Sequence, residues 1–295
     1  MSRPSTFVPP ACSRSRTLRT ARGDFAVLDA VPEAPAGGHR GAALLVPGFT
    51  GSKEDFIALL QPLTDAGYRI VAVDGRGQYE STGPADPQAY AQEELARDLL
   101  AQAAALADET GGGPVHLLGH SLGGQISRAA VLIDATPFRT LTLMSSGPAL
   151  ISEDQRTKVR LLSEALASMD MARVWEAIQT QETPQDVDVE GEAEGKAVRE
   201  HLRQRWLRHN PVQLITTGRQ LSVEPDRVAE LAAVTSLPKH VLSGERDEVW
   251  PVALIDEMAV RLGARRTVVA GAEHSPNTDR PAETARALSD FWTHH

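Results

Sequence analysis

The chain has 295 residues, 41% of them hydrophobic, which suffices for one large core or two small ones. Its 30 lysines and arginines against 39 aspartates and glutamates leave a net charge of −9, which argues against a nucleic-acid partner because phosphate binding needs a basic face. The sequence holds no apolar run long enough to span a bilayer, and its first residues lack the apolar stretch of a secretory signal, so we expect a cytoplasmic protein without a membrane span.

Residues 1–22 form the only concentrated basic stretch of the chain. We expect a solvated N-terminal arm that frays, although an arm that binds a partner would have the same composition. Its arginines are Arg3, Arg14, Arg16, Arg19 and Arg22. The next run, DFAVLDAV at Asp24–Val31, predicts an antiparallel edge strand.

Short β-branched runs then alternate with longer helical patterns. Strands are predicted at 42–48, 68–74, 115–119 and 139–146, and helices at 53–67, 88–108 and 122–134. Because these strands are apolar throughout and alternate with helices, the pattern indicates a mainly parallel sheet covered on both faces, that is, a three-layer α/β sandwich.

From Gly147 to Leu237 the alternation stops and no convincing strand is visible. Three charged amphipathic stretches predict helices, and the acidic run ETPQDVDVEGEAEG, Glu182–Gly195, predicts a loop. A structureless loop of the total length is implausible in a compact domain. We therefore predict a helical cap with a return helix over 147–235, inserted into a core formed by 23–146 and 236–295, where strands and helices alternate again.

One serine stands between a predicted strand and a predicted helix, in the sequence Gly119-His120-Ser121-Leu122-Gly123. The glycines allow a sharp turn without a Cβ clash, so the hydroxyl would stand clear at the carboxyl edge of the sheet, where ligands bind in such folds. Ser121 is therefore the candidate nucleophile. The alternative is that Ser121 only caps the helix.

A serine hydroxyl needs a neighbouring base, and His274 is the best placed of nine histidines because it follows the last predicted strand on a loop. His120 adjoins the serine, but the side chain before the nucleophile points away from the hydroxyl in this type of turn. His116 lies within a strand and is expected to pack in the core. We expect solvated positions for two histidines of the insertion, His201 and His209.

The carboxylate that orients the base is expected at the end of another strand, in VLSGERDEVW. Asp247 is preferred because the turn before VWP would place it in the loop that faces His274. Alternatively, Asp247 only caps the helix that starts near Pro251, and Glu248 is then the reserve.

The oxyanion of an acyl-transfer intermediate needs backbone N–H donors. One donor is expected from Leu122, at the start of the helix that follows the nucleophile. The other is expected from Phe49 in VPGFTGS, where Gly48 allows a close approach.

The sequence resembles the α/β-hydrolase fold superfamily, in its esterase and lipase-like branch with a helical cap, from Ala42 to the C-terminus. The chain order Ser121, Asp247, His274 matches the order typical of that fold. VAVDGRGQYES resembles the family's Asp-x-Arg-Gly-x-Gly-x-Ser loop, which implies that Asp74 and Arg76 brace the loops around the site.

The chain departs from the family at two places. Pro47 replaces the histidine that normally supports the oxyanion loop, so we expect a hole of different rigidity. The second glycine of the other loop is replaced, so Tyr79 and Glu80 either shape the pocket or lie on the surface.

These residues predict a serine hydrolase that cleaves a carboxylic ester or a related acyl bond of a small-molecule substrate. No metal and no organic cofactor is implied. Trp175, Trp206 and Trp250 either line an apolar acyl pocket or pack the cap onto the core. The same residues would serve an acyltransferase, thioesterase, lactonase, carbon–carbon hydrolase or perhydrolase, and some members of the fold act as ligand receptors. The sequence leaves the oligomeric state open.

Overall fold

The computed structural model describes residues 3–4, 6–33, 40–181 and 192–295. Its centre is an eight-stranded sheet with strand order β1-β2-β4-β3-β5-β6-β7-β8, in which β3 to β8 run parallel and β1 and β2 antiparallel. The strands are β1 Ser13–Thr20, β2 Gly23–Ala30, β3 Gly41–Val46, β4 Tyr68–Val73, β5 Val115–His120, β6 Phe138–Met144, β7 Lys239–Gly244 and β8 Arg265–Val269.

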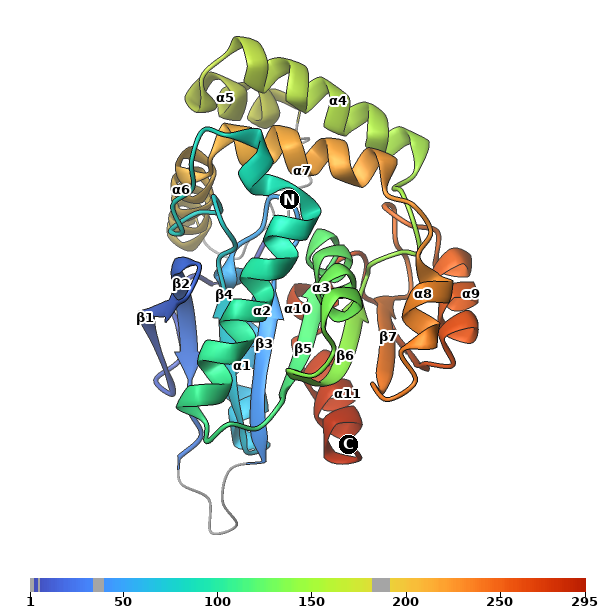
Figure 1. Ribbon diagram of the computed structural model, residues 1–295. Coiled ribbons are helices and arrows are strands. Elements are labelled where there is room, and N and C mark those ends of the chain that lie inside the picture. The colour runs from blue at the N-terminus through green and yellow to red at the C-terminus, as the bar shows by residue number, and fades with distance from the viewer. Residues whose placement is uncertain (1–2, 5, 34–39, 182–191) are drawn as a thin grey trace.

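Helices cover both faces of this sheet (Figure 1). One apolar core lies beneath α2 Gln92–Glu109, α3 Leu122–Ile133, α8 Val228–Ala233 and α9 Val252–Leu262. The second core lies beneath α1 Ile57–Asp65 and α11 Pro281–Thr293. The central strands are apolar along their whole length because both of their faces are buried. The predicted three-layer α/β sandwich is confirmed.

Three short helical turns complete the core. They are η1 Lys53–Phe56, η2 Pro87–Tyr90 and α10 Pro276–Asp279. Two of them matter for the site, because η1 follows the loop after β3 and α10 follows the loop after β8.

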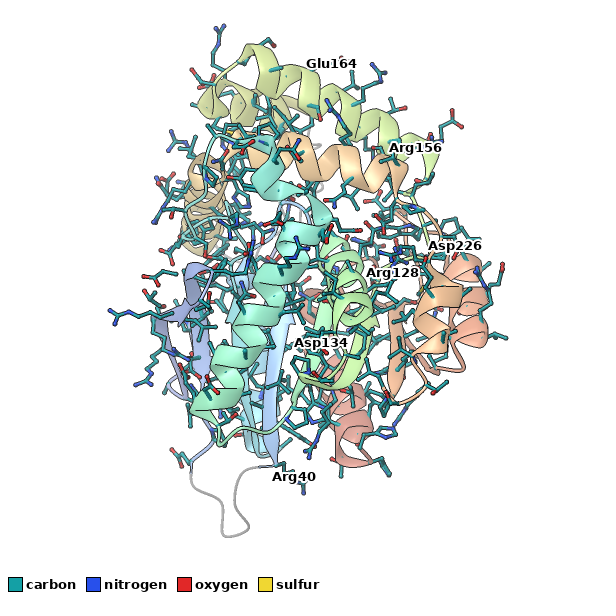
Figure 2. The ribbon with its side chains drawn as sticks, viewed as in Figure 1. Arg40, Arg128, Asp134, Arg156, Glu164 and Asp226 are labelled. Atoms are coloured by element: carbon teal, nitrogen blue, oxygen red, sulfur yellow. The ribbon has the colours of Figure 1, made fainter. Side chains whose placement is uncertain are left out.

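Four helices between β6 and β7 form a separate layer over one end of the sheet, which we call the helical layer (Figure 1). Its own apolar cluster includes Leu166, Val174, Trp175, Leu202 and Trp206. Charged side chains such as Glu164 lie on its outer face (Figure 2). The helices are α4 Glu153–Ser168, α5 Met171–Gln181, α6 Glu192–Arg208 and α7 Pro211–Val223.

The N-terminal stretch differs from its expected form, because residues 13–20 are not a frayed arm but strand β1. Leu18 of β1 is buried in the core, and Arg16 of the same strand has acidic partners on β2 and α2. Arg16 pairs with Asp29 at 2.7 Å and with Glu109 at 2.7 Å. Strand β2 is antiparallel, as predicted, but the edge of the sheet is formed by β1 and not by β2.

The expected acidic loop falls mostly on residues 182–191, which lie outside the described residues. Its last four residues begin α6 and are therefore helical. Within the described parts of the chain, no helix has both the length and the apolar character needed to cross a membrane.

Candidate active site

Ser121 occupies the sharp turn between β5 and α3, with φ 54° and ψ −120°. A non-glycine residue at positive φ is strained, and the surrounding packing holds it there. The neighbouring glycines have no room for a side chain: a Cβ on Gly119 would overlap the Gly123 carbonyl, and one on Gly123 would overlap the Val46 carbonyl. The glycine collar therefore lets two strands and one helix approach closely around the serine.

The three residues expected to act together lie within hydrogen-bonding distance of one another. His274 Nε2 is 3.1 Å from Ser121 Oγ, and His274 Nδ1 is 2.9 Å from Asp247 Oδ2. The Asp247 carboxylate is fully buried, and its Oδ1 also accepts hydrogen bonds from the amides of Val249 and Trp250. The sequence left open whether Asp247 orients His274 or caps the start of the next helix. In the structure its carboxylate bonds both to His274 and to the amides of the turn before α9.

The reserve carboxylate, Glu248, points elsewhere. Its side chain is 73% exposed and lies 3.7 Å from Lys158. Asp247 is therefore the carboxylate beside His274.

His120 holds the loop that carries His274. Its Nε2–H donates to the His274 carbonyl oxygen at 2.9 Å, because a carbonyl can only accept. Burial lowers the pKa of His120 to about 3, so the ring is neutral at physiological pH. The expectation that His120 turns away from the serine hydroxyl agrees with this contact, but its bond to the histidine loop was not foreseen.

The loop after β3 passes directly beside Ser121. A Cβ on Gly48 would lie 3.2 Å from Ser121 Cβ, so only glycine fits there comfortably. Gln78, in the loop after β4, supports this loop, since its Nε2 donates to the Gly48 carbonyl at 2.9 Å while its Oε1 accepts from the Gly75 amide. Gln78 thus gives the loop a side-chain support at a place where Pro47 cannot supply one.

The two residues expected to brace the loops make contacts of that kind. The Asp74 carboxylate accepts from the Lys53 amide and from Lys53 Nζ, both at 2.8 Å, which ties η1 to the end of β4. Arg76 donates twice to Asp98 of α2, at 2.6 Å each.

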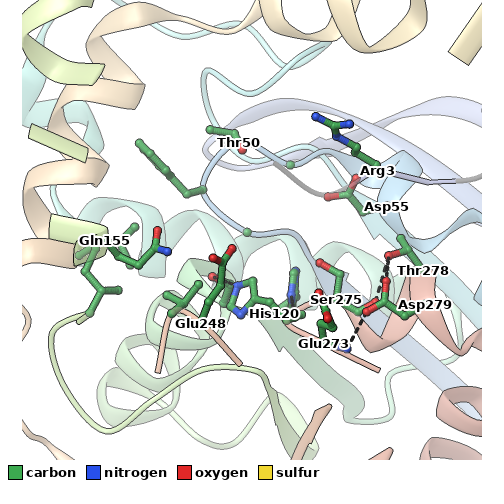
Figure 3. Close-up of a pocket in the computed structure, with 18 of the residues that line it drawn as sticks. Arg3, Thr50, Asp55, His120, Gln155, Glu248, Glu273, Ser275, Thr278 and Asp279 are labelled. Carbon is green, nitrogen blue, oxygen red and sulfur yellow. Dashed lines mark hydrogen bonds between the residues drawn. The ribbon is translucent and has the colours of Figure 1, made fainter. Parts of the chain in front are cut away.

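A pocket of about 360 Å³ opens at Ser121. Apolar side chains next to α4 and α7 line one part of it, and polar or charged ones from residue 3, η1 and the His274 loop line another part (Figure 3). The apolar group comprises Phe49, Ile151, Val159, Leu221 and Val249. The polar group comprises Arg3, Asp55, Glu273, Ser275, Thr278 and Asp279, with Glu248 and Gln155 on the far side.

The aromatic residues expected at the pocket are not among the described residues that line it. Trp175 and Trp206 are buried in the cluster of the helical layer, and Trp206 Nε1 donates to the Met171 carbonyl at 2.7 Å. Trp250 is buried in the core and donates to the Ala149 carbonyl at 2.9 Å. Tyr79 lies between the cations of Lys53 and Arg208. Of the two alternatives left open by the sequence, pocket wall or packing, the three tryptophans therefore take the packing one.

Of three further histidines, two lie where the sequence predicted and one does not. His116 is packed in the core as expected, 2.9 Å from Thr140 Oγ1. His209 was expected on a solvated face but is buried, with Nδ1 2.8 Å from the Arg205 carbonyl and Nε2 3.2 Å from the Gly51 carbonyl. The reason is that Arg205, on one face of the last turn of α6, points into the core, and His209 follows four residues later on the same side. His201 is exposed, as expected.

No group of three or more histidine, cysteine, aspartate or glutamate side chains in the described part of the chain could hold a metal ion.

The sequence pattern described as "Alpha/beta hydrolase family" matches residues 43–287. The chain belongs to the alpha/beta hydrolase family. A Bacillus subtilis (strain 168) protein with the provisional name 2-succinyl-6-hydroxy-2,4-cyclohexadiene-1-carboxylate synthase is 24% identical over 279 residues, which cover 91% of this chain and 94% of that protein.

Two solved structures have the same fold. A thermophilic esterase from Thermogutta terrifontis has a TM-score of 0.73 at 21% identity, over 95% of this chain and 98% of that one. The enol-lactonase from Burkholderia xenovorans LB400 has a TM-score of 0.72 at 18% identity, over 94% and 100%. At this identity the likeness establishes the shared fold.

Proposed function

We propose that this protein is a serine hydrolase that cleaves a carboxylic ester or a related acyl bond through an acyl-enzyme. The observation that carries the proposal is the chain of contacts from buried Asp247 through His274 to Ser121, at the floor of a pocket. A serine on a strained turn with a histidine at 3.1 Å has the arrangement that nucleophilic catalysis requires.

In the first half-reaction, Ser121 Oγ attacks the carbonyl carbon while His274 Nε2 takes the hydroxyl proton. Asp247 keeps the His274 Nδ1–H directed toward it and stabilises the imidazolium that forms. The negative charge on the carbonyl oxygen is received by the amides of Phe49 and Leu122. His274 then gives its proton to the leaving alcohol. In the second half-reaction, His274 takes a proton from the water that attacks the acyl carbon; the bond from that carbon to Ser121 Oγ then breaks, His274 returns the proton to Oγ, and the carboxylic acid leaves.

The pocket supports a compact acyl substrate. Its volume of about 360 Å³ is at the lower end of the range for small-molecule sites. The apolar wall beside Val159 and Leu221 suits an acyl chain, and the helices α4 and α7 that carry these residues would act as part of a cap.

The charge of the lining also bears on the substrate. Four carboxylates, of Asp55, Glu248, Glu273 and Asp279, face one guanidinium, of Arg3. Cations outside the pocket wall pair with three of them, Arg205 with Asp55, Arg246 with Glu273 and Lys158 with Glu248 at 3.7 Å. The charges around the pocket therefore nearly cancel, and comparing a neutral ester with an anionic one tests whether the pocket accepts an anionic acyl group.

A carbon–carbon bond cleavage is the second candidate, supported by the nearly full-length match to the Bacillus subtilis protein. The name of that protein refers to a succinyl and a carboxylate group.

Labelling with a fluorophosphonate probe tests the proposal. The probe should modify the protein once, at Ser121, as read by peptide mass spectrometry. The variant Ser121→Ala should lose the label, and its kcat on p-nitrophenyl esters should fall by a factor on the order of 10⁴ to 10⁶.

The substrate panel should pair p-nitrophenyl butyrate with the matching hemisuccinate, and include a thioester and a lactone. Repeated turnover separates an enzyme from a receptor, which would react slowly or once. Labelling that persists in Ser121→Ala would remove the assignment of the nucleophile.

A further inference from the structure

One arginine of the helical layer reaches into the core beside the site. Arg205, in the last turn of α6, donates from Nη1 to Asp55 Oδ1 at 2.6 Å, and its Nη1 also lies 3.4 Å from Ser52 Oγ. Both side chains of the ion pair have 0% exposure. His209, one turn after Arg205, lies with its Nε2 3.2 Å from the Gly51 carbonyl. The end of α6 therefore contacts the turn Gly48–Ser52 and η1 through two side chains.

Asp55 is connected in turn to both loops of the candidate site. Its Oδ2 accepts from the Ser52 amide at 3.4 Å, and a Cβ on Gly51 would overlap its carboxylate. The backbone carbonyl of Asp55 accepts from Asn277 Nδ2 at 2.7 Å, and Asn277 is three residues after His274 in the sequence. The residue therefore lies between the loop that carries Phe49 and the loop that carries His274.

Stability alone is a weak explanation for a buried ion pair. The cost of removing both charges from water largely offsets their attraction, and apolar residues often replace such pairs without loss. What an arginine–aspartate pair supplies beyond that is a fixed geometry between the two elements it joins.

We propose that Arg205 is a positioning residue: through Asp55 it fixes the turn Gly48–Ser52 and the His274 loop relative to Ser121, so that the oxyanion donors and the base are aligned only when α6 is seated on the core. The inference rests on the proposed function, since it assigns a role within that reaction. A displacement of about 1 Å at a reacting centre can cost about 10²-fold in rate.

A second buried pair provides the matched control. Arg128 of α3 donates to Glu224, which directly follows α7, at 2.6 Å, with exposures of 2% and 3% (Figure 2 labels Arg128). This pair also joins the core to the end of the helical layer. Arg128 contacts Glu224 and the carbonyls of Gly147 and Pro148, away from the turn Gly48–Ser52.

The test compares Arg205→Met with Arg128→Met. For each variant we would measure the unfolding midpoint, the rate constant of fluorophosphonate labelling at Ser121, and kcat and KM for p-nitrophenyl acetate per folded molecule. Both variants should lose stability. Only Arg205→Met should lower the labelling rate and kcat, by about 10²-fold with KM changed less than about threefold. Arg205→Lys should recover part of the rate.

Equal labelling rates in the two methionine variants, or a change in KM alone, would overturn the positioning role. If Arg205→Met does not fold, Asp55→Asn provides the same comparison, since it removes the charge but keeps an acceptor oxygen and the backbone carbonyl. Absence of labelling in the parent protein would instead remove the proposed function, so the two failures are distinguishable.

Discussion

At the scale of single residues, the Asp247 carboxylate makes contacts that asparagine cannot reproduce. One oxygen serves the amides of Val249 and Trp250, and both oxygens lie 2.9 to 3.0 Å from His274 Nδ1. An amide side chain in its place can still accept from the turn, but its NH₂ group would then face the ring nitrogen. The imidazole would be driven to the tautomer that cannot accept the serine proton.

We therefore expect Asp247→Asn to lower kcat on every ester of a panel by about 10⁴-fold, with KM and thermal stability nearly unchanged. Steady-state kinetics with a set of acyl chain lengths would measure this. Glu248→Gln is the control, because Glu248 is exposed and should retain nearly the parental rate. An equal loss in both variants would contradict the assignment of the carboxylate.

The sequence sufficed for Ser121, His274 and Asp247 because each follows a strand at the same edge of a parallel sheet, where motif and chain order restrict the choice. It did not suffice for His120, Gln78 and Arg205. Their contacts depend on the direction in which a side chain leaves its element and on which distant backbone carbonyl or carboxylate it meets. The catalytic roles themselves remain predictions until they are tested.

At the scale of elements, most strands and helices could be predicted, because their apolar runs and helical periods are long. Strand β1 could not. Its sequence SRSRTLRT has one large apolar residue, Leu18, and three arginines, so it resembles a solvated segment. Only the fold reveals that Asp29 and Glu109 neutralise Arg16 and that Leu18 enters the core.

The contribution of β1 to stability can be measured directly. Leu18→Ala should lower the free energy of unfolding by about 2–5 kcal/mol, because Leu18 is fully buried. Arg19→Ala, on the opposite and exposed face of the same strand, should stay within about 0.5 kcal/mol of the parent. Urea denaturation followed by circular dichroism compares the two. Equal small effects would mean that β1 is dispensable.

The tryptophans illustrate a different limit. A helical period places Trp175 and Trp206 on apolar faces, but it does not tell a pocket wall from an inter-helix contact. In the fold, both side chains fill the space between α5, α6 and their neighbours. Sequence alone therefore left their role open, and packing decides it.

At the scale of the whole molecule, buried histidines make stability depend on pH. Burial lowers the pKa values of His116, His120 and His240 to about 3 and that of His209 to about 4. In the unfolded chain, histidine titrates near about 6.5. Between these values the unfolded state binds protons that the native state does not, so stability falls as pH is lowered below about 6.5.

Two buried acids oppose this trend. Burial raises the pKa values of Asp55 and Asp74, so their native forms take up protons before the unfolded ones do. Each titrating group changes stability by up to about 1.4 kcal/mol per pH unit. Four histidines against two acids leave a net loss of stability on acidification.

We expect the free energy of unfolding to fall between pH 6.5 and pH 4.5, measured by urea denaturation at several pH values. His240→Gln can keep a bond to Thr267 Oγ1. In this variant the free energy of unfolding should fall less steeply with pH, by the contribution of one histidine, up to about 1.4 kcal/mol per pH unit. A stability that is constant over this interval would contradict the expected neutrality of the buried rings.

The loop that carries His274 has a consequence for how the chain gains activity. Its carbonyl is held by His120, 154 residues earlier, and Asn277 is held by Asp55, 222 residues earlier. Contacts between such distant segments form late, because a long loop must close first. A fragment that ends before His274 contains Ser121 and Asp247 but lacks the histidine that lies between them. The reactivity of Ser121 is therefore a property of the finished chain, and it reports that the last quarter of the sequence has docked onto the first.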